Sequence, residues 1–104
     1  MEITVADLKA WRDEGKPHQL VDVREAAELQ AASVQGATHI PMATVPGRKG
    51  EVATDRPVVV MCHHGGRSMQ VTRWLRANGF PNAVNLAGGI DLWSVRIDPA
   101  VPRY

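Results

Sequence analysis

The segment from residue 57 to residue 68 constrains the fold of this chain more than any other. Pro57 is followed by an unbroken apolar run from Val58 to Met61. A β-branched run of this length predicts a strand that is buried on both faces. The run leads directly into Cys62-His63-His64-Gly65-Gly66-Arg67-Ser68. We therefore expect a central strand that ends in a glycine-rich loop.

Three other segments carry the signals of helices. Thr4 and Asp7 have the spacing of a capping box, and apolar residues then recur at helical spacing up to Gly15. Residues 26–32 suit a second helix. A third helix is predicted to follow the glycine-rich loop and to end at Gly79-Phe80-Pro81, because a glycine, an apolar residue and a proline are typical of a helix C-terminus.

Short strands are predicted between these helices. They cover residues 20–23, 37–40, 57–61 and 83–86, while residues 46–50 are predicted to form a polar surface loop. Strands that alternate with helices are joined by right-handed crossovers, which predicts an α/β fold with a mostly parallel sheet and helices on both faces. Ligands of such sheets bind beyond the carboxyl ends of the strands, which is where the glycine-rich loop lies.

Composition excludes several classes of protein. A chain of 104 residues is long enough for one domain and too short for two, so we expect a single domain over residues 1–104. Twelve Lys and Arg against eleven Asp and Glu give a net charge of +1, which offers no extended field for nucleic acid or an anionic membrane. No apolar run reaches the roughly 18 residues of a membrane span, and no signal peptide is evident. We expect a soluble, cytoplasmic monomer.

Cys62 is the only cysteine, so it cannot form an internal disulfide. Two glycines in its loop allow several backbone N–H groups to converge on one point, and the following helix adds the positive end of its dipole. Such surroundings lower the pKa of a thiol from about 8.5 to about 7 or less. A lone cysteine is more often an inert apolar residue, but this position favours a nucleophile.

The residues after Cys62 are candidates for binding an anionic substrate. Arg67 puts a cation in the first turn of a helix, where it opposes the dipole by about 0.3 to 1 kcal/mol, and this cost indicates that Arg67 binds an anion. Ser68 either caps the helix or contacts the ligand through its hydroxyl. His63 and His64 are either solvated side chains or partial cations facing the substrate. Two adjacent histidines and one cysteine make a poor metal site.

The loop resembles the active-site loop of the rhodanese family, in which the catalytic cysteine opens a six-residue loop, here Cys62 to Arg67. The likeness covers nearly the whole chain, and the segments similar to the other family landmarks are Leu20-Val21-Asp22-Val23-Arg24-Glu25, Gly36-Ala37-Thr38-His39-Ile40-Pro41 and Leu86-Ala87-Gly88-Gly89-Ile90-Asp91-Leu92-Trp93. The resemblance implies a three-layer α/β/α rhodanese-like fold with a five-stranded, mostly parallel central sheet.

The resemblance also implies a sulfurtransferase. Cys62 would attack the outer sulfur of a small anionic donor such as thiosulfate, hold it as a persulfide, and pass it to cyanide, a thiol or a protein acceptor, without a metal or cofactor. The substrate-binding residues would be His63, His64, Gly65, Gly66, Arg67 and Ser68. Thiosulfate-specialised members often carry a strongly basic residue where this chain has His63. A polysulfide, glutathione persulfide or protein persulfide is therefore an alternative donor.

Asp22 and Arg24 match the family's Asp-Val-Arg segment. We expect them to form an ion pair that braces neighbouring loops, in preference to a contact with substrate. Gly88, Gly89 and Trp93 are interpreted in the same way, as turn geometry and packing.

Two alternative functions stay open. The first is a cysteine phosphatase or arsenate reductase, in which the loop arginine comes six positions after the cysteine. Arg67 comes only five positions after Cys62. The shorter loop should enclose a smaller space, which suits a single sulfur atom better than a tetrahedral oxyanion. The other alternative is a sulfur-carrier or regulatory module with little free turnover.

Overall fold

Five short strands form one sheet in which every pairing is parallel. The computed structural model describes residues 1–104. The strands are β1 (Glu2–Ile3), β2 (Gln19–Asp22), β3 (Thr38–His39), β4 (Val58–Met61) and β5 (Ala83–Leu86). Their order in the sheet is β1-β5-β4-β2-β3. The predicted parallel α/β sheet is confirmed, and β4 lies at its centre.

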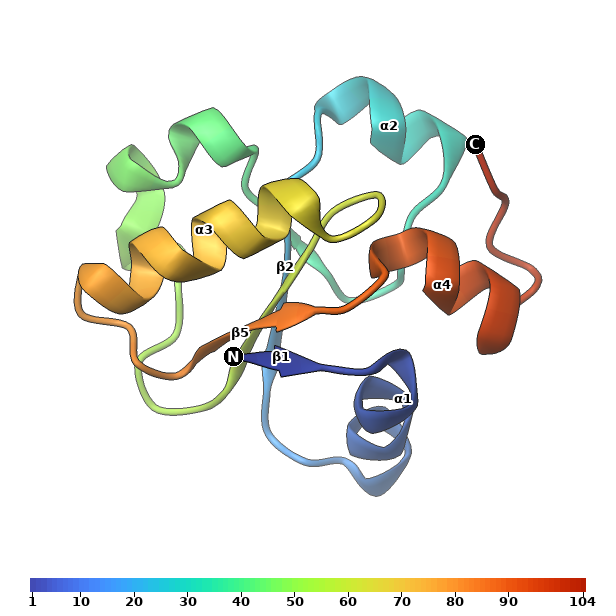
Figure 1. The fold of residues 1–104 in the computed structure, drawn as a ribbon, viewed down its shortest axis with the longest axis horizontal. Coiled ribbons are helices and arrows are strands. Elements are labelled where there is room, and N and C mark those ends of the chain that lie inside the picture. Colours follow the sequence, from blue (N-terminus) through green and yellow to red (C-terminus); the bar gives the residue numbers. More distant parts are fainter.

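Helices cover both faces of the sheet (Figure 1). They are α1 (Val5–Glu14), α2 (Ala26–Ala31), α3 (Gly66–Ala77) and α4 (Gly89–Arg96), with two 3-10 helices, η1 (Met42–Thr44) and η2 (Pro46–Glu51). Helices α1 and α4 contact each other on one face, whereas α3 packs on the opposite face beside η1. The fold therefore has the three layers that the resemblance implied. None of these helices has the length and apolar character needed to cross a membrane.

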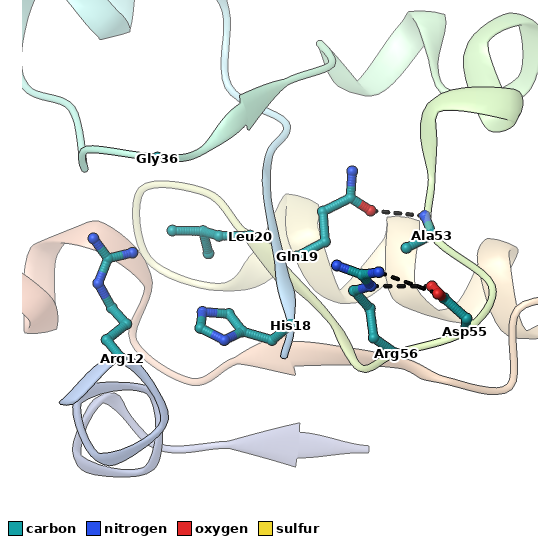
Figure 2. A pocket seen from close by; sticks show the side chains of 8 residues that line it. All are labelled: Arg12, His18, Gln19, Leu20, Gly36, Ala53, Asp55 and Arg56. Carbon is teal, nitrogen blue, oxygen red and sulfur yellow. Dashed lines mark hydrogen bonds and ion pairs between the residues drawn. The ribbon is translucent and has the colours of Figure 1, made fainter. Parts of the chain in front are cut away.

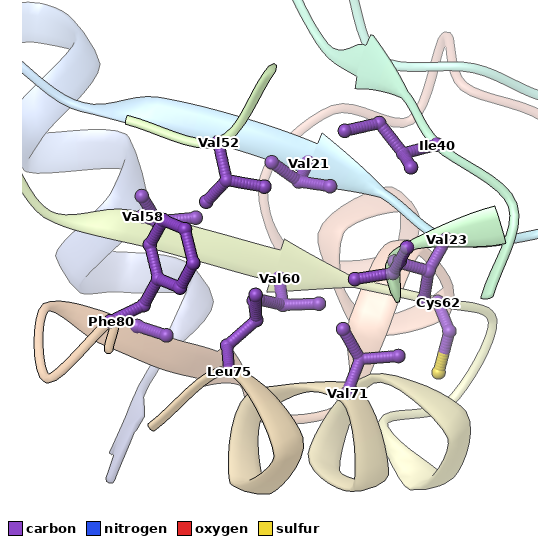
Figure 3. Packing of buried hydrophobic residues seen from close by; sticks show 12 residues of the cluster. Val21, Val23, Ile40, Val52, Val58, Val60, Cys62, Val71, Leu75 and Phe80 are labelled. Atoms are coloured by element: carbon purple, nitrogen blue, oxygen red, sulfur yellow. The ribbon is translucent and has the colours of Figure 1, made fainter. Parts of the chain in front are cut away.

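Strand β4 fixes the position of the glycine-rich loop. Its four side chains are fully buried, with Val58 and Val60 on the α3 face and Val59 and Met61 on the other face. Burial of each such side chain contributes roughly 1.5 to 3 kcal/mol. Cys62 continues the row of Val58 and Val60, and its sulfur points toward the start of α3 (Figure 3). The strand that anchors the core thus also sets where Cys62 stands.

The ends of α1 and α3 follow local sequence signals. The Asp7 N–H donates to Thr4 Oγ1 over 3.1 Å and the Thr4 N–H donates to Asp7 Oδ2 over 2.9 Å, which is the predicted capping box. At the end of α3, the Phe80 N–H donates to the Leu75 carbonyl over 2.9 Å, the bond that is typical of a glycine-terminated helix.

Two elements differ from the predictions. Strand β1 was not predicted, because two residues carry no periodicity and this strand exists through its pairing with Asn85 and Leu86 of β5. Residues 46–50 were predicted as a polar surface loop; they are mostly exposed, but they form most of η2. The chain there closes short turns, as in the hydrogen bond from the Arg48 N–H to the Val45 carbonyl over 3.1 Å.

Candidate active site

Cys62 lies at the carboxyl edge of the sheet, between the end of β4 and the start of α3. Only 1% of its surface is exposed. Its Sγ accepts a hydrogen bond from the Gly65 N–H over 3.1 Å, and the Ser68 hydroxyl oxygen lies 3.2 Å away. The cysteine is therefore buried, but its sulfur has hydrogen-bond donors beside it as well as apolar side chains.

The pKa of the Cys62 thiol lies below its ordinary value because two opposing effects do not cancel. Burial raises the pKa, since it disfavours the charged form. Hydrogen bonds from the Ser68 hydroxyl and from the backbone N–H groups of Ser68, Gly65 and His64 lower the pKa, and together they outweigh burial. The loop thus stabilises an ionised sulfur away from bulk water.

Gly65 gives the loop its curvature. Its φ is +110°, in a region that residues with a side chain rarely adopt. This conformation lets the Gly65 N–H face Cys62 Sγ while its carbonyl accepts from Asn85 Nδ2 over 3.2 Å. A side chain at this position would strain the turn that directs the N–H at the sulfur.

The first residues of α4 hold the opposite side of the loop. The Ile90 N–H donates to the Cys62 carbonyl over 2.9 Å, and the Asp91 N–H donates to the His63 carbonyl over 3.1 Å. A Cβ at Gly89 would lie 2.4 Å from the Cys62 carbonyl oxygen, so this close approach requires glycine. Because α4 binds the loop carbonyls, the loop N–H groups are left to face Cys62 Sγ.

Ser68 has one hydroxyl hydrogen and two acceptors. Its Oγ is 3.2 Å from Cys62 Sγ and 2.5 Å from Asn85 Oδ1. Asn85 is buried, and its Nδ2 donates to the Gly65 carbonyl and to the Glu2 carboxylate, which fixes the orientation of the amide. Asn85 and the sulfur therefore share the hydroxyl hydrogen. Sequence analysis missed Asn85, whose one signal is a polar residue inside an apolar strand.

Arg67 is bound by a carboxylate of the chain itself. Its two terminal nitrogens donate to the two oxygens of Glu28 over 2.6 and 2.9 Å. Glu28 Oε1 also accepts from the Glu25 N–H over 3.1 Å, and Oε2 accepts from the Tyr104 hydroxyl over 2.7 Å. The Arg67 hydrogen bonds are the main reason that the pKa of Glu28 falls to about 2. The anion that Arg67 contacts here is thus Glu28, which sequence analysis did not identify.

His63 is half-buried between two rings and is not a solvated loop side chain. Its ring centroid is 3.9 Å from that of Tyr104, at an interplanar angle of 8°, and 3.9 Å from that of His64. Burial is the main cause that lowers the pKa of His63, and the nearby His64 adds to it. His64 itself is exposed. The His63 ring is therefore neutral at neutral pH.

One cluster near the loop has ligand atoms close enough for a metal ion. Atoms of His63, His64 and Asp91 all lie within 4.8 Å of one another. Both Asp91 oxygens, however, accept from Arg103 over 3.0 and 3.2 Å. A metal ion would have to displace Arg103, and we assign no metal to this cluster.

Asp22 and Arg24 form the expected ion pair, with a shortest distance of 2.6 Å between Arg24 Nη2 and Asp22 Oδ2. The Arg24 Nε–H also donates to Asp22, and the remaining Nη hydrogens reach the carbonyls of Glu28 and Ala32 and the Tyr104 hydroxyl. All five N–H groups of a guanidinium are thereby used. Arg24 has no donor left for a substrate, so this pair is a structural brace.

A polar cavity of about 280 Å³ lies at the opposite, amino edge of the sheet (Figure 2). It contains none of the predicted site residues, and its lining is Arg12, His18, Gln19, Leu20, Gly36, Ala53, Asp55 and Arg56. Arg56 is paired with Asp55, and Gln19 accepts from the Ala53 N–H. No thiol or hydroxyl nucleophile lines this cavity, and Cys62 remains the candidate nucleophile.

Comparison with known proteins shows which family the chain resembles. A family described as Rhodanese-like domain matches residues 4–96. The Rhodanese-like/PpiC domain-containing protein 12, chloroplastic, of Arabidopsis thaliana is 38% identical over 90 residues, which cover 83% of this chain and 30% of that protein. A protein named Sulfurtransferase from Allochromatium vinosum is 39% identical over 75 residues, which cover 72% of this chain and 70% of that protein.

Solved structures show the same architecture. The crystal structure of a rhodanese-like domain protein from Staphylococcus aureus superimposes with a TM-score of 0.86 at 34% identity, covering 100% of this chain and 99% of that one. Three of the curated relatives are much longer proteins, and this chain spans only 23 to 30% of their length.

Proposed function

Because the chain belongs to the rhodanese-like domain family, we propose that it is a sulfurtransferase that carries one sulfane sulfur on Cys62. Relatives that are named sulfurtransferases support such an activity in general. The observation that carries the proposal is the convergence of the Gly65 N–H and the Ser68 hydroxyl on Cys62 Sγ. These donors stabilise negative charge on sulfur, which is the property that a persulfide carrier needs.

The first half-reaction loads the cysteine. The Cys62 thiolate attacks the outer sulfur of the donor, the donor's sulfur–sulfur bond breaks, and the leaving group takes the electron pair. That group is sulfite if the donor is thiosulfate, and a thiolate if the donor is a persulfide. The terminal sulfur on Cys62 then carries the charge that the loop N–H groups face.

The second half-reaction passes the terminal sulfur to an acceptor. Cyanide would become thiocyanate, and a thiol, either free or on a protein, would become a persulfide. The Cys62 thiolate is the leaving group in this step, and a thiol of lowered pKa leaves faster. One loop therefore serves both steps, without a proton donor.

The burial of Cys62 favours a second candidate, a sulfur carrier that turns over slowly with small acceptors. Because only 1% of Cys62 is exposed, an acceptor can reach its sulfur only if the surrounding groups move. A partner protein that opens the loop would make this step fast. The phosphatase alternative finds no such support, because Glu28 already occupies the face of Arg67 that would bind a tetrahedral oxyanion.

One experiment separates these functions. The protein is incubated with thiosulfate or with glutathione persulfide, intact-mass spectrometry detects an added sulfur atom, and cyanide is then supplied to release thiocyanate. We expect both signals from the parent protein and neither from Cys62→Ser. Rapid loading with slow thiocyanate release would identify the carrier. Equal loading of Cys62→Ser would contradict both sulfur-transfer functions.

Ser68→Ala provides an independent check on the loop chemistry. Loss of the hydroxyl donor should raise the pKa of Cys62, because burial would then be opposed by backbone N–H groups alone. The measurement is the rate of alkylation by iodoacetamide as a function of pH. The half-point of the curve should move to higher pH in the variant, and an unchanged half-point would show that Ser68 does not act on the sulfur.

A further inference from the structure

Arg67 is the only Lys or Arg of the Cys62 loop, and it is the natural contact for an anionic donor. The pKa of Arg67 is raised chiefly by its hydrogen bonds to Glu28 and, to a smaller degree, by the negative charge of Cys62. Arg67 also directly precedes Ser68, whose hydroxyl oxygen lies 3.2 Å from Cys62 Sγ. His63 adds no charge at neutral pH, because burial keeps its ring neutral.

Glu28 holds the Arg67 guanidinium more firmly than an ordinary surface contact would. The pair is bidentate, and the Glu25 N–H and the Tyr104 hydroxyl complete four hydrogen bonds to the carboxylate. The exposed fractions of the Arg67 and Glu28 side chains are 34% and 20%. Bidentate pairs with additional donors are stronger than the typical exposed ion pair.

The other arginines beside the loop also have carboxylate partners. Asp22 is bound by Arg24, and Asp91 is bound by Arg103 and lies 3.9 Å from His64 Nε2. We call Arg67, Glu28, Asp91 and Arg103 the mouth of the loop, and each arginine in it has a carboxylate partner. A dianion that approaches Cys62 finds no net positive charge unless it displaces Glu28.

From this arrangement we propose that Glu28 is a specificity-determining residue, which neutralises Arg67 and so favours thiol persulfides over thiosulfate as sulfur donors. The inference rests on the proposed sulfurtransferase function. With thiosulfate, the Cys62 thiolate takes the outer sulfur and sulfite leaves with two negative charges. With a persulfide R–S–SH, the thiolate takes the terminal SH sulfur and R–S⁻ leaves with one. The neutral mouth stabilises the single charge of R–S⁻ more readily than the double charge of sulfite.

The test measures the second-order rate constant for loading Cys62 with each of two donors. The donors are thiosulfate and N-acetylcysteamine persulfide, whose one ionisable group is its own sulfur. The proteins are the parent, Glu28→Gln, Arg67→Gln and the double variant. Glu14→Gln is the matched control, because it makes the same change of net charge at an exposed site at the end of α1.

We expect the ratio of the thiosulfate constant to the persulfide constant to follow the charge at the mouth. Glu28→Gln should raise the ratio about tenfold, Arg67→Gln should lower it about tenfold, and the double variant should return close to the parent. Glu14→Gln should leave the ratio unchanged. Added salt should slow thiosulfate loading of Glu28→Gln and should affect the parent much less.

Other outcomes would overturn the inference. If Glu28→Gln slows both donors equally, Glu28 only braces the loop. If thermal unfolding shows that Glu28→Gln does not fold, Arg67→Gln becomes the deciding variant. An equal fall in the loading rate constants for both donors in Arg67→Gln would again contradict the charge effect. If no donor loads Cys62 in the parent protein, the proposed function itself fails, and that result is distinct from an unchanged ratio.

Discussion

Two arginine–carboxylate pairs lie at the same edge of the sheet, and they differ in the donors that they leave free. The side chains of Arg24 and Asp22 are 0% and 2% exposed, and every N–H of Arg24 is engaged. Arg67 and Glu28 are partly exposed, and the Arg67 Nε–H has no partner within the chain. The same chemical pair can therefore be a fixed brace in the core or an adjustable charge at a site.

The Tyr104 hydroxyl joins the two pairs. It accepts from Arg24 Nη1 over 2.9 Å and donates to Glu28 Oε2 over 2.7 Å. Figure 1 shows the C-terminus beside α2, the helix that carries Glu28. A variant in either pair should therefore affect the other pair as well. The expected losses in the free energy of unfolding decrease from the buried pair to the exposed surface.

Asp22→Asn should give the largest effect, because it leaves the buried charge of Arg24 without a counter-ion. We expect the free energy of unfolding to fall by about 3 kcal/mol or more. Urea unfolding at neutral pH, followed by circular dichroism, measures this change. A loss below about 1 kcal/mol would mean that the other hydrogen bonds of Arg24 suffice, and the distinction between brace and adjustable pair would break down.

Glu28→Gln should have a smaller effect that depends on pH. The pKa of Glu28 is about 2 in the folded protein against an ordinary value of 4.5, so its contribution is present above about pH 4.5 and is lost as pH falls toward 2. After allowance for solvent screening of the partly exposed pair, we expect about 1 kcal/mol.

The measurement is a set of unfolding curves between about pH 7 and pH 2. The parent should lose stability more steeply than Glu28→Gln between pH 4.5 and 2, and the two curves should converge at the acid end. Glu14→Gln should run parallel to the parent. Parallel curves for the parent and Glu28→Gln would show that the ion pair does not stabilise the fold.

Tyr104→Phe tests the link between the pairs. It removes one hydrogen bond from each, and we expect a loss of about 1 kcal/mol. Combined with Glu28→Gln, the losses should be less than additive, because both changes remove the same hydrogen bond. Strict additivity in a double-mutant cycle would mean that the hydroxyl does not couple the two pairs.

Lys9→Gln should give the smallest change in the free energy of unfolding, and it serves as the reference for a solvent-exposed ion pair. Lys9 and Asp13 are 2.7 Å apart on the surface of α1, with 48% and 59% of their side chains exposed. We expect a loss of about 0.3 to 0.5 kcal/mol that disappears at high salt. A loss as large as that of Glu28→Gln would remove the reason to treat the Arg67 pair as special.

Local signals explain which parts of the fold are predictable from sequence. The capping box at Thr4 and the apolar run of β4 act through residues that are neighbours in the chain, and both elements form where the sequence predicts them. The position of the Cys62 loop follows for the same reason. Strand β1 is different, because its two residues become a strand only beside β5.

The site itself depends on contacts that local patterns do not encode. Glu28 and Arg67 are 39 residues apart, and Arg24 and Tyr104 are 80 residues apart. The first turn of α3 indicates that Arg67 binds an anion, but nothing near it in the sequence identifies Glu28. Asn85 is similar, since its role appears only when β5 is placed beside α3.

The hold of α4 on the loop carbonyls has a consequence for protein engineering. The backbone at Gly89 approaches Cys62 too closely for any side chain, and the peptide groups of Ile90 and Asp91 keep the loop turned. Grafting the seven residues Cys62 to Ser68 onto another sheet would therefore transfer the cysteine without the contacts that orient its loop. The smallest unit that keeps this orientation includes the loop, the helix that follows it and the Gly88-Gly89 turn, which begins 26 residues after Cys62.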